Sequence, residues 1–361
     1  MSGSAAPFRV LVVDDSAFIR RAVERMLEPM KRVEIAGFAT TGAEALEEVR
    51  RLQPELVLMD VNMPEMDGLQ ALERIMAERP TPVLLLSTVT KPGAEATLRG
   101  LELGALDVID KGSTGGGPMD IFELAPLLRE KVEGIMGSRR VPAPVPAPEP
   151  SPPTLPTPAP EPRAASPYQV VAIGCSTGGP RALAEVLPSL PAGFGAGVVV
   201  AQHMPAGFTD TFAERMDRRC RLSVREAADG DEVRPGEVLI APGRREIRVE
   251  KEDGRTRVRI SDGGDRIHQP SVDVLFSSLA NAVGAAAIGV VLTGMGEDGA
   301  RGLQRLRDAG GRTIVESETT AVIDGMPAAA RHAAETVLPL PRIGPALADL
   351  CAAGTSALHA S

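Results

Sequence analysis

Aromatic side chains are scarce in this chain. Its 361 residues include no Trp, one Tyr and eight Phe, although 43% of the residues are apolar. Proteins that hold single-stranded nucleic acid usually stack its bases on aromatic rings, and membrane proteins usually carry Trp and Tyr at the membrane interface. The composition therefore argues against both classes, while the apolar fraction, mostly Ala, Val and Leu, suffices for a sizeable core.

Positive charge, paired cysteines and long apolar runs are also lacking. The net charge is −9; the segment 1–137 has 15 basic and 22 acidic residues, and 168–361 has 21 and 24. Because neither segment is basic, we expect no nucleic-acid partner bound through its phosphates. Cys175, Cys220 and Cys351 form no CxxC pair, and no apolar run reaches the length of a membrane span. We therefore expect a protein of the reducing cytoplasm that is not inserted in a membrane.

Proline, in contrast, is concentrated in one place. Twelve of the 32 prolines fall between Pro142 and Pro167. Proline has no backbone N–H and restricts the residue before it, so neither a helix nor a central strand can form there. We predict that residues 138–167 are a semi-rigid spacer; the alternative is a ligand for a proline-binding module. The spacer separates a predicted domain at 1–137 from a second at 168–361.

The N-terminal domain alternates short apolar runs with amphipathic stretches. The apolar runs predict five strands, at 8–13, 33–37, 55–60, 82–87 and 106–109. Alternation of this kind is typical of an α/β fold with a flavodoxin-like, doubly wound parallel sheet and helices on both faces.

The C-terminal domain resumes the alternation with longer apolar runs. Residues 168–174, 197–203 and 286–294 are nearly continuous apolar runs, as buried parallel strands require. Residues 222–260 hold four shorter runs separated by Gly and Asp turns. The pattern predicts a doubly wound, mostly parallel α/β domain with an antiparallel insertion.

Acidic and polar residues follow the predicted N-terminal strands. Asp14 and Asp15 come after the first strand, Asp60 ends the third, Ser87 ends the fourth, and Lys111 follows the fifth. The carboxyl ends of parallel strands meet at one edge of a sheet, where ligands bind. Three carboxylates there need a cation, and oxygen ligands suit Mg²⁺. An Asp beside such a metal can accept a phosphoryl group.

Residues 8–136 resemble the response-regulator receiver domain. The resemblance rests on LVVDDSAFIRR, LVLMDVNMPEMDG, LLLST and the position of Lys111. It implies that Asp60 is the phosphoacceptor, that Asp14, Asp15 and the Asn62 backbone carbonyl join it around Mg²⁺, and that Ser87 and Lys111 bind the phosphoryl oxygens. Gly112 stands where the family usually has Pro, and Val108 where many receivers carry a switch aromatic, which affects how the signal leaves the domain.

A serine follows the first strand of the C-terminal domain. In GCSTGGP, Ser176 satisfies the G-x-S-x-G pattern, which exposes a serine in a strand–turn–helix arrangement at a helix N-terminus. A Gly-rich phosphate loop is the competing interpretation, although no Walker lysine is present. A serine nucleophile needs a base and an acid that orients it. His203 ends the strand GVVVAQH at the same sheet edge, and Asp298 follows AAIGVVL, although spacing alone does not separate it from Glu297.

Residues 168–352 resemble the catalytic domain of the chemotaxis protein-glutamate methylesterase family. The resemblance rests on AIGCSTGGP, QHMP, APG, PSVDVLF and VLTGMGEDG. It implies that Ser176 is the nucleophile, His203 the base and Asp298 the orienting acid, and that Thr177 and Met295 lie near the oxyanion and the substrate. At His268-Gln269-Pro270 the chain departs from the family, where Arg often precedes the Pro.

The two resemblances together imply a phosphorylation-regulated serine esterase. It would remove methyl groups from glutamate γ-esters on the cytoplasmic helices of chemoreceptors, and deamidate receptor glutamines, with no cofactor for the esterase chemistry. The expected partners are a chemotaxis histidine kinase as phosphodonor and methylated chemoreceptors as substrate. The alternative is a non-catalytic, phosphorylation-driven adaptor of a paralogous chemosensory pathway.

Overall fold

The chain folds into two compact units. In this computed structural model, the described residues are 6–88, 91–112, 120–138, 168–264 and 268–352. The units are Met1–Val145 and Pro146–Ser361. The predicted spacer at 138–167 lies, except for Ser138, outside the described residues, so its structure and the predicted domain limits stay predictions.

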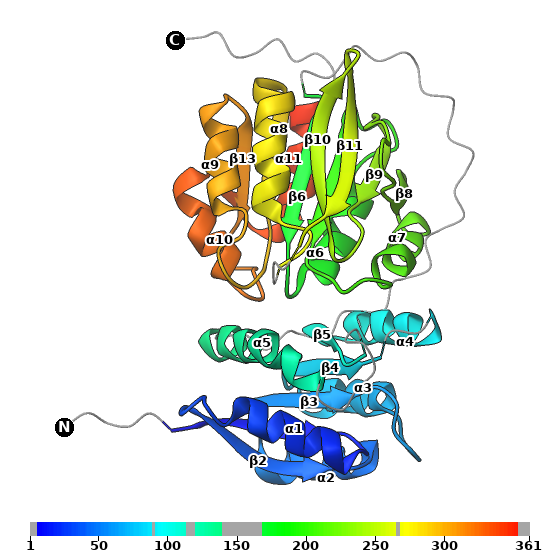
Figure 1. Cartoon of the computed structure of the whole chain (residues 1–361), viewed down its shortest axis with the longest axis vertical. Helices are drawn as coiled ribbons and strands as arrows, with labels where there is room; N and C mark the ends of the chain where they lie inside the picture. Colours follow the sequence, from blue (N-terminus) through cyan, green and yellow to red (C-terminus); the bar gives the residue numbers. More distant parts are fainter. Residues whose placement is uncertain (1–5, 89–90, 113–119, 139–167, 265–267, 353–361) are drawn as a thin grey trace, which may run out of the picture. The chain divides into compact units, whose positions relative to one another are not determined.

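The first unit is built on a five-stranded parallel sheet (Figure 1). Its strands are β1 (Phe8–Val13), β2 (Val33–Ala39), β3 (Leu56–Asp60), β4 (Val83–Ser87) and β5 (Asp107–Asp110). They lie in the order β2-β1-β3-β4-β5, so the chain winds outward in both directions from β1. This order confirms the predicted flavodoxin-like sheet.

Helices connect these strands. They are α1 (Ala17–Leu27), α2 (Gly42–Leu52), α3 (Gly68–Glu78), α4 (Lys91–Glu102) and α5 (Ala125–Gly137), with the short 3-10 helix η1 (Asp120–Leu124). Side-chain caps determine where several of these helices begin. The Ser16 side chain accepts a hydrogen bond from the Ile19 N–H at the start of α1, and Asp67 forms a capping box with Gln70 at the start of α3. α1 packs against α5, and α2 packs against α3.

The second unit contains a seven-stranded sheet. Its strands, in spatial order, are β14 (Thr336–Leu338), β13 (Arg312–Glu316), β12 (Ala287–Val291), β6 (Val170–Cys175), β7 (Gly197–Gln202), β9 (Glu237–Ile240) and β8 (Ser223–Glu226). Every neighbouring pair in this sheet is parallel. The three strands β12, β6 and β7 are buried throughout, which explains why they form nearly continuous apolar runs in the sequence.

The antiparallel insertion is smaller than predicted. It is present as one antiparallel pair of strands, β10 (Arg245–Glu252) and β11 (Arg255–Asp262). β8 and β9, which we assigned to the same insertion, are parallel edge strands of the main sheet. The predicted insertion is therefore confirmed for β10 and β11, whereas the antiparallel direction predicted for β8 and β9 was wrong, because apolar alternation does not report strand direction. The segment 227–236 is long enough to cross back and start β9 in the direction of β8.

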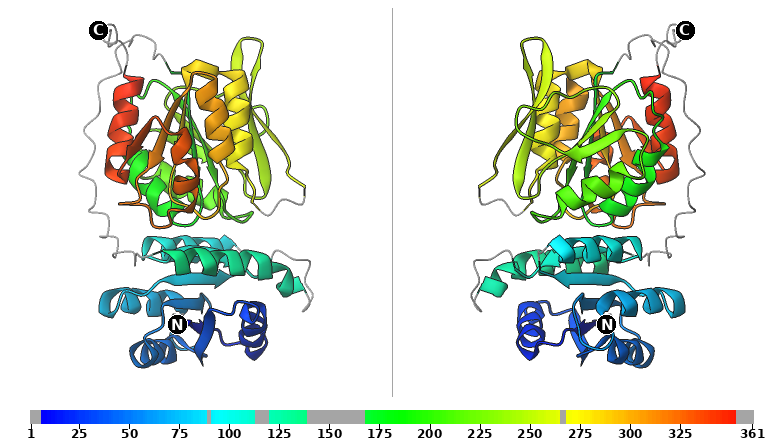
Figure 2. Two further views of the ribbon diagram at one scale, coloured as in Figure 1. Left: turned by 90° about the vertical axis from the view of Figure 1, so that its left-hand side faces the viewer. Right: turned by 90° about the vertical axis from the view of Figure 1, so that its right-hand side faces the viewer.

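Helices cover both faces of this sheet (Figure 2). They are α6 (Gly179–Val186), α7 (Thr209–Asp217), α8 (Val272–Ala282), α9 (Ala300–Asp308), α10 (Gly325–Ala330) and α11 (Leu340–Cys351), with the 3-10 helices η2 (Leu187–Ser189), η3 (Gly284–Ala286) and η4 (Arg331–Ala333). α6 and α11 pack together on one face, and α8 and α9 pack together on the other.

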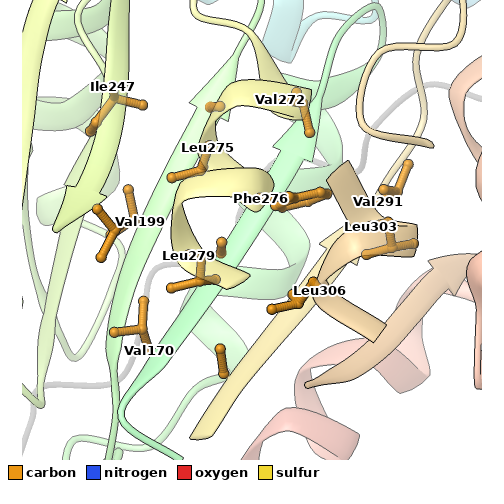
Figure 3. Close-up of a cluster of buried hydrophobic side chains, with 14 of the residues drawn as sticks. Val170, Val199, Ile247, Val272, Leu275, Phe276, Leu279, Val291, Leu303 and Leu306 are labelled. Carbon is orange, nitrogen blue, oxygen red and sulfur yellow. The ribbon is translucent and has the colours of Figure 1, made fainter. Parts of the chain in front are cut away.

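Helix α8 is central to the core of the second unit. Leu275, Phe276 and Leu279 on α8 have no exposed surface. They pack into one cluster with side chains from the sheet, from α9 and from the β10–β11 hairpin, including Val199 and Ile247 (Figure 3). The apolar burial fixes α8, and with it the residues at its N-terminus, against the sheet. Among the described residues no helix combines the length and apolar character needed to cross a bilayer.

Candidate functional site

The carboxyl ends of β1, β3 and β5 bring four charged side chains together. Carboxylate oxygens of Asp14, Asp15 and Asp60 all lie within 4.8 Å of one another. Lys111 Nζ lies 2.9 Å from Asp14 Oδ2 and 2.9 Å from Asp60 Oδ1. The parallel register, in which β1 and β4 each pair with β3, accounts for this convergence of residues far apart in the sequence.

This acidic cluster has the donor set of a magnesium site. Burial raises the pKa of Asp14, and the positive charge and hydrogen bond of Lys111 only partly oppose it. Asp14 is fully buried, whereas Asp15 is exposed, so the cluster opens to solvent on one side. A hard divalent cation bound by these oxygens would offset the mutual repulsion of the carboxylates. The residues present therefore fit Mg²⁺.

The other predicted receiver residues line the same sheet edge. Ser87 is buried at the end of β4, and its Oγ accepts from Thr97 Oγ1 at 2.8 Å. Asn62 is exposed in the loop between β3 and α3. Gly68 closes this loop: a Cβ there would lie 2.0 Å from the Asp60 carbonyl oxygen. The loop can approach Asp60 only because this position lacks a side chain.

The two departures from the receiver pattern lie at β5. Val108 is 2% exposed within the strand, so its side chain belongs to the core rather than to the surface. The Gly112 N–H donates to Asp110 Oδ1 at 2.8 Å.

In the second unit, Ser176 occupies the turn between β6 and α6. Its N–H donates to the Thr293 carbonyl at 3.0 Å, and its carbonyl accepts from the Gly179 N–H at 2.8 Å. Gly178, with φ +81°, takes the left-handed conformation of the turn. The predicted strand–turn–helix is present, but Ser176 is only 4% exposed rather than open to solvent. The tight packing of the turn against the end of β12 accounts for this burial.

His203 lies beside Ser176 because of the strand register. Cys175 pairs with Gln202 across β6 and β7, so the next residues on the two strands are Ser176 and His203. The His203 N–H donates to the Cys175 carbonyl at 3.0 Å, which continues the ladder. On its other side, His203 Nε2 lies 2.9 Å from Asp298 Oδ2.

Asp298 is held by hydrogen-bond donors from the start of α8. It accepts from the backbone N–H groups of Val272 at 2.8 Å and Asp273 at 2.9 Å, and from Ser271 Oγ at 3.1 Å. Burial opposes its ionisation, but His203 and these backbone donors outweigh burial and lower the pKa of Asp298 to about 2. Asp298 is therefore an ionised carboxylate, which accepts hydrogen bonds and has no proton to donate. Glu297, the alternative left open by spacing, is exposed.

The ionised Asp298 determines which nitrogen of His203 carries the proton. Because the carboxylate only accepts hydrogen bonds, Nε2 carries the proton and Nδ1 carries the lone pair. His203 Nδ1 is buried and has no hydrogen-bond partner within the described part of the chain. The ring stacks on His268, with centroids 5.0 Å apart and planes at 19°. His203 thus holds an unprotonated ring nitrogen at the position next to Ser176 in the strand register.

Gln202 is a site residue that sequence reasoning missed. It is 1% exposed, and its Nε2 donates to the carbonyls of Ser176 at 2.9 Å and His203 at 3.0 Å. Its Oε1 accepts from the Cys175 thiol at 3.0 Å. The signal in the sequence was a polar residue directly before His203 at the end of an apolar strand. Gln202 fixes the backbone of Ser176 to that of His203.

Thr177 and Met295 lie in the loops that enclose Ser176. Both are buried, and the Thr177 carbonyl accepts from Thr293 Oγ1 at 3.0 Å. Gly294, next to Met295, lets the loop after β12 approach the nucleophile turn, since a Cβ there would lie 2.8 Å from the Ser176 Cβ. Ser176, His203 and Asp298 therefore lie at one end of the sheet, and Thr177 and Met295 follow Ser176 and Gly294 in the adjoining loops.

The fold and these two sites define a receiver-type domain followed by an α/β domain with a Ser-His-Asp arrangement at the end of its sheet. Residues 10–116 match the family model described as response regulator receiver domain, and residues 171–347 match CheB methylesterase.

Relatives resemble the chain over nearly its whole length. A protein-glutamate methylesterase/protein-glutamine glutaminase of Alkalilimnicola ehrlichii is 42% identical over 95% of this chain and 99% of its own. Another, of Geobacter sulfurreducens, is 43% identical over 95% and 97%. The crystal structure of the Thermotoga maritima CheB methylesterase catalytic domain is 41% identical, with a TM-score of 0.49, over 51% of this chain and 98% of that one. The chain belongs to the protein-glutamate methylesterase/protein-glutamine glutaminase family, whose members are hydrolases with a receiver domain.

Proposed function

We propose that this protein hydrolyses glutamate γ-methyl esters on the cytoplasmic helices of chemoreceptors, and that the same site deamidates receptor glutamines. The observation that carries the proposal is the pairing of His203 Nε2 with the ionised Asp298, which leaves the lone pair on Nδ1 of the residue next to Ser176 in the strand register. The names of its relatives give the substrate class. A complete Ser-His-Asp set argues for an enzyme rather than for a non-catalytic adaptor.

The reaction proceeds in two steps. Ser176 Oγ attacks the ester carbonyl while His203 Nδ1 takes its proton; the C–OCH₃ bond then breaks, and methanol leaves with that proton. Water attacks the acyl-serine, gives a proton to Nδ1, and frees the glutamate carboxylate; the proton returns to Ser176. In deamidation ammonia takes the place of methanol. Asp298 stabilises the imidazolium that forms in each step, and backbone N–H groups at Thr177 and Met295 hold the oxyanion.

The receiver domain controls this activity. A histidine kinase supplies the phosphoryl group, and Asp60 accepts it. Asp14, Asp15, Asp60 and the Asn62 backbone carbonyl would hold Mg²⁺, which would neutralise charge on the phosphoryl oxygens. Ser87 and Lys111 bind those oxygens, and the short distances from Lys111 to Asp14 and Asp60 support this role. The esterase chemistry itself uses the side chains of Ser176, His203 and Asp298 with backbone N–H groups, and no cofactor takes part in it.

Methanol release from methylated receptors tests the catalytic role. Ser176→Ala should abolish methanol release while the protein keeps its wild-type thermal unfolding. Ser223→Ala, on the exposed edge of β8, is the matched control and should keep full activity. A Ser176→Ala protein as active as wild type would sink the assignment.

A second experiment tests regulation in the full chain. A small-molecule phosphodonor with Mg²⁺ should raise methanol release by the wild-type protein and leave Asp60→Asn unchanged. Equal stimulation of both proteins, or of neither, would contradict control through Asp60.

A further inference from the structure

A buried carboxyl group lies behind the Ser176 turn and has no part in the proposed hydrolysis. Glu316 ends β13 and is fully buried. Its Oε2 accepts from the Thr293 N–H at 2.8 Å. Its Oε1 is buried and has no hydrogen-bond partner in the described segments. Burying a carboxyl oxygen without a hydrogen-bond partner costs folding free energy, so a role in function would explain why the chain keeps this group.

Thr293 connects this carboxyl group to the nucleophile turn. The Thr293 carbonyl accepts from the Ser176 N–H at 3.0 Å, and Thr293 Oγ1 donates to the Thr177 carbonyl at 3.0 Å. Thr293 Oγ1 also accepts from the Ile323 N–H at 2.9 Å. One residue therefore separates Glu316 from the backbone of the nucleophile. A change at the carboxyl group reaches the nucleophile turn through two hydrogen bonds.

The charged groups around Glu316 are mostly acidic. Glu185 on α6 and Asp324 at the start of α10 both act on it, and Arg331 is already paired with Asp324 at 2.5 and 2.6 Å. On β6 the Cys175 thiol is buried, and its pKa is raised by that burial and by the charge of Glu316.

The protonation of Glu316 follows from this environment. Burial raises the pKa of Glu316 to about 7, and the charges of Glu185 and Asp324 add to burial, while the Thr293 N–H and the Thr320 hydroxyl oppose it. Both the neutral and the ionised form are therefore populated near neutral pH.

We propose that Glu316 is a positioning residue for the hydrolysis, with its neutral form supporting the reaction and its ionised form slowing it. The neutral group carries its proton on Oε1 and still accepts the Thr293 N–H through Oε2, so the Ser176 turn keeps its place. The ionised group puts a buried negative charge one residue behind the Ser176 turn, and that charge opposes the negative charge that develops at the turn in the transition state. This inference rests on the hydrolysis proposed for Ser176.

The ratio of two pH profiles tests this role. The variant Glu316→Gln keeps an acceptor for the Thr293 N–H and cannot ionise. In the full chain with phosphodonor, the kcat of Glu316→Gln relative to wild type should rise by up to about tenfold from about pH 6 to about pH 8, since the neutral fraction of Glu316 falls by that factor. Ionisations common to both proteins, including that of the imidazole, cancel in the ratio. KM should be the same in both, and a ratio independent of pH would overturn the proposal.

Two further variants keep the proposal testable if Glu316→Gln does not fold. Thr320→Val removes the hydroxyl group that lowers the pKa of Glu316, so the fall of activity with rising pH should occur at higher pH in this variant than in the wild type. Glu185→Gln removes a negative charge that raises the pKa of Glu316, so the fall of activity with rising pH should occur at lower pH than in the wild type. Opposite shifts support the role of Glu316, and the absence of both would overturn it.

A measurement that needs no activity separates this inference from the proposed function. The Thr293 amide resonance of the full chain should titrate near neutral pH in the wild type and not in Glu316→Gln. Should Ser176→Ala stay active, the hydrolytic mechanism fails while this titration still reports the ionisation of Glu316. An amide resonance that does not titrate shows that Glu316 keeps one form, and it refutes the inference alone.

Discussion

Asp273 and Asp298 cap one another's helices. Asp298 accepts the N–H groups of Val272 and Asp273 at the start of α8, and Asp273 Oδ1 accepts those of Gly299 at 3.0 Å and Gly302 at 2.7 Å at the start of α9. Two helix N-termini thus fix two carboxylates, and one of them orients His203. The positive ends of the helices favour the ionised acids. The catalytic carboxylate is therefore placed before substrate arrives.

Asp298→Asn should lower kcat by about 10⁴-fold, the loss found when the acid of a related triad is neutralised. The asparagine amide would donate to His203 Nε2 and favour the tautomer with its proton on Nδ1, which removes the base. Methanol release measures the loss. Glu297→Gln is the matched control and should keep kcat, because Glu297 is exposed. Equal losses in both variants would contradict the choice of Asp298.

The same carboxylate should contribute to stability in a pH-dependent way. The pKa of Asp298 is lowered to about 2 from 3.8, so its contribution is fully present above about pH 4 and is lost as the pH falls toward 2. The shift corresponds to about 2 kcal/mol of unfolding free energy. Urea unfolding of wild type and Asp298→Asn should show a difference of this size near neutral pH that shrinks on acidification. A difference that stays constant down to pH 2 would refute the assignment.

Replacing Gln202 should slow the reaction without weakening substrate binding. Gln202→Met removes both donors to the carbonyls of Ser176 and His203, so the two residues are no longer fixed to each other. We expect kcat to fall by roughly 10-fold to 100-fold with KM nearly unchanged, since small misplacements are costly in catalysis. The control is Gln304→Ala, because the Gln304 amide donates a hydrogen bond to Asp308 on its own helix, away from Ser176 in the sequence. An increase confined to KM would indicate a substrate contact instead.

In the receiver domain, Asp14→Asn should stabilise the protein in the absence of divalent cations. Burial raises the pKa of Asp14, so keeping this group ionised at neutral pH costs folding free energy that the neutral amide avoids. A gain of about 1 kcal/mol is typical of such a change. Calorimetry with a chelator should show a higher unfolding temperature for Asp14→Asn, and added Mg²⁺ should stabilise only the wild type.

The control for this prediction is Asp15→Asn. Asp15 is exposed and its carboxylate has little folding cost to relieve, so its replacement should weaken Mg²⁺ binding without stabilising the metal-free protein. A gain in stability as large as that of Asp14→Asn would show that general charge reduction, rather than burial, is the cause.

The sequence predicted most of the sheet and the site, because both depend on local pattern. Buried parallel strands are continuous apolar runs, and β6, β7 and β12 were found that way. Ser176 and His203 stand directly after two such strands, so their approach follows from the parallel sheet alone.

What only the tertiary structure decided are relationships between distant segments. The direction of β8 and β9, the choice of Asp298 over Glu297, and the assignment of Nδ1 as the base depend on contacts that no local pattern encodes. The roles of Gln202 and Glu316 depend on burial in the same way, because a polar residue at a strand end looks alike in sequence whether it faces water or a neighbouring loop. Strand ends are fixed by local pattern, whereas hydrogen-bond partners are fixed by packing, and the chemistry proposed here requires both.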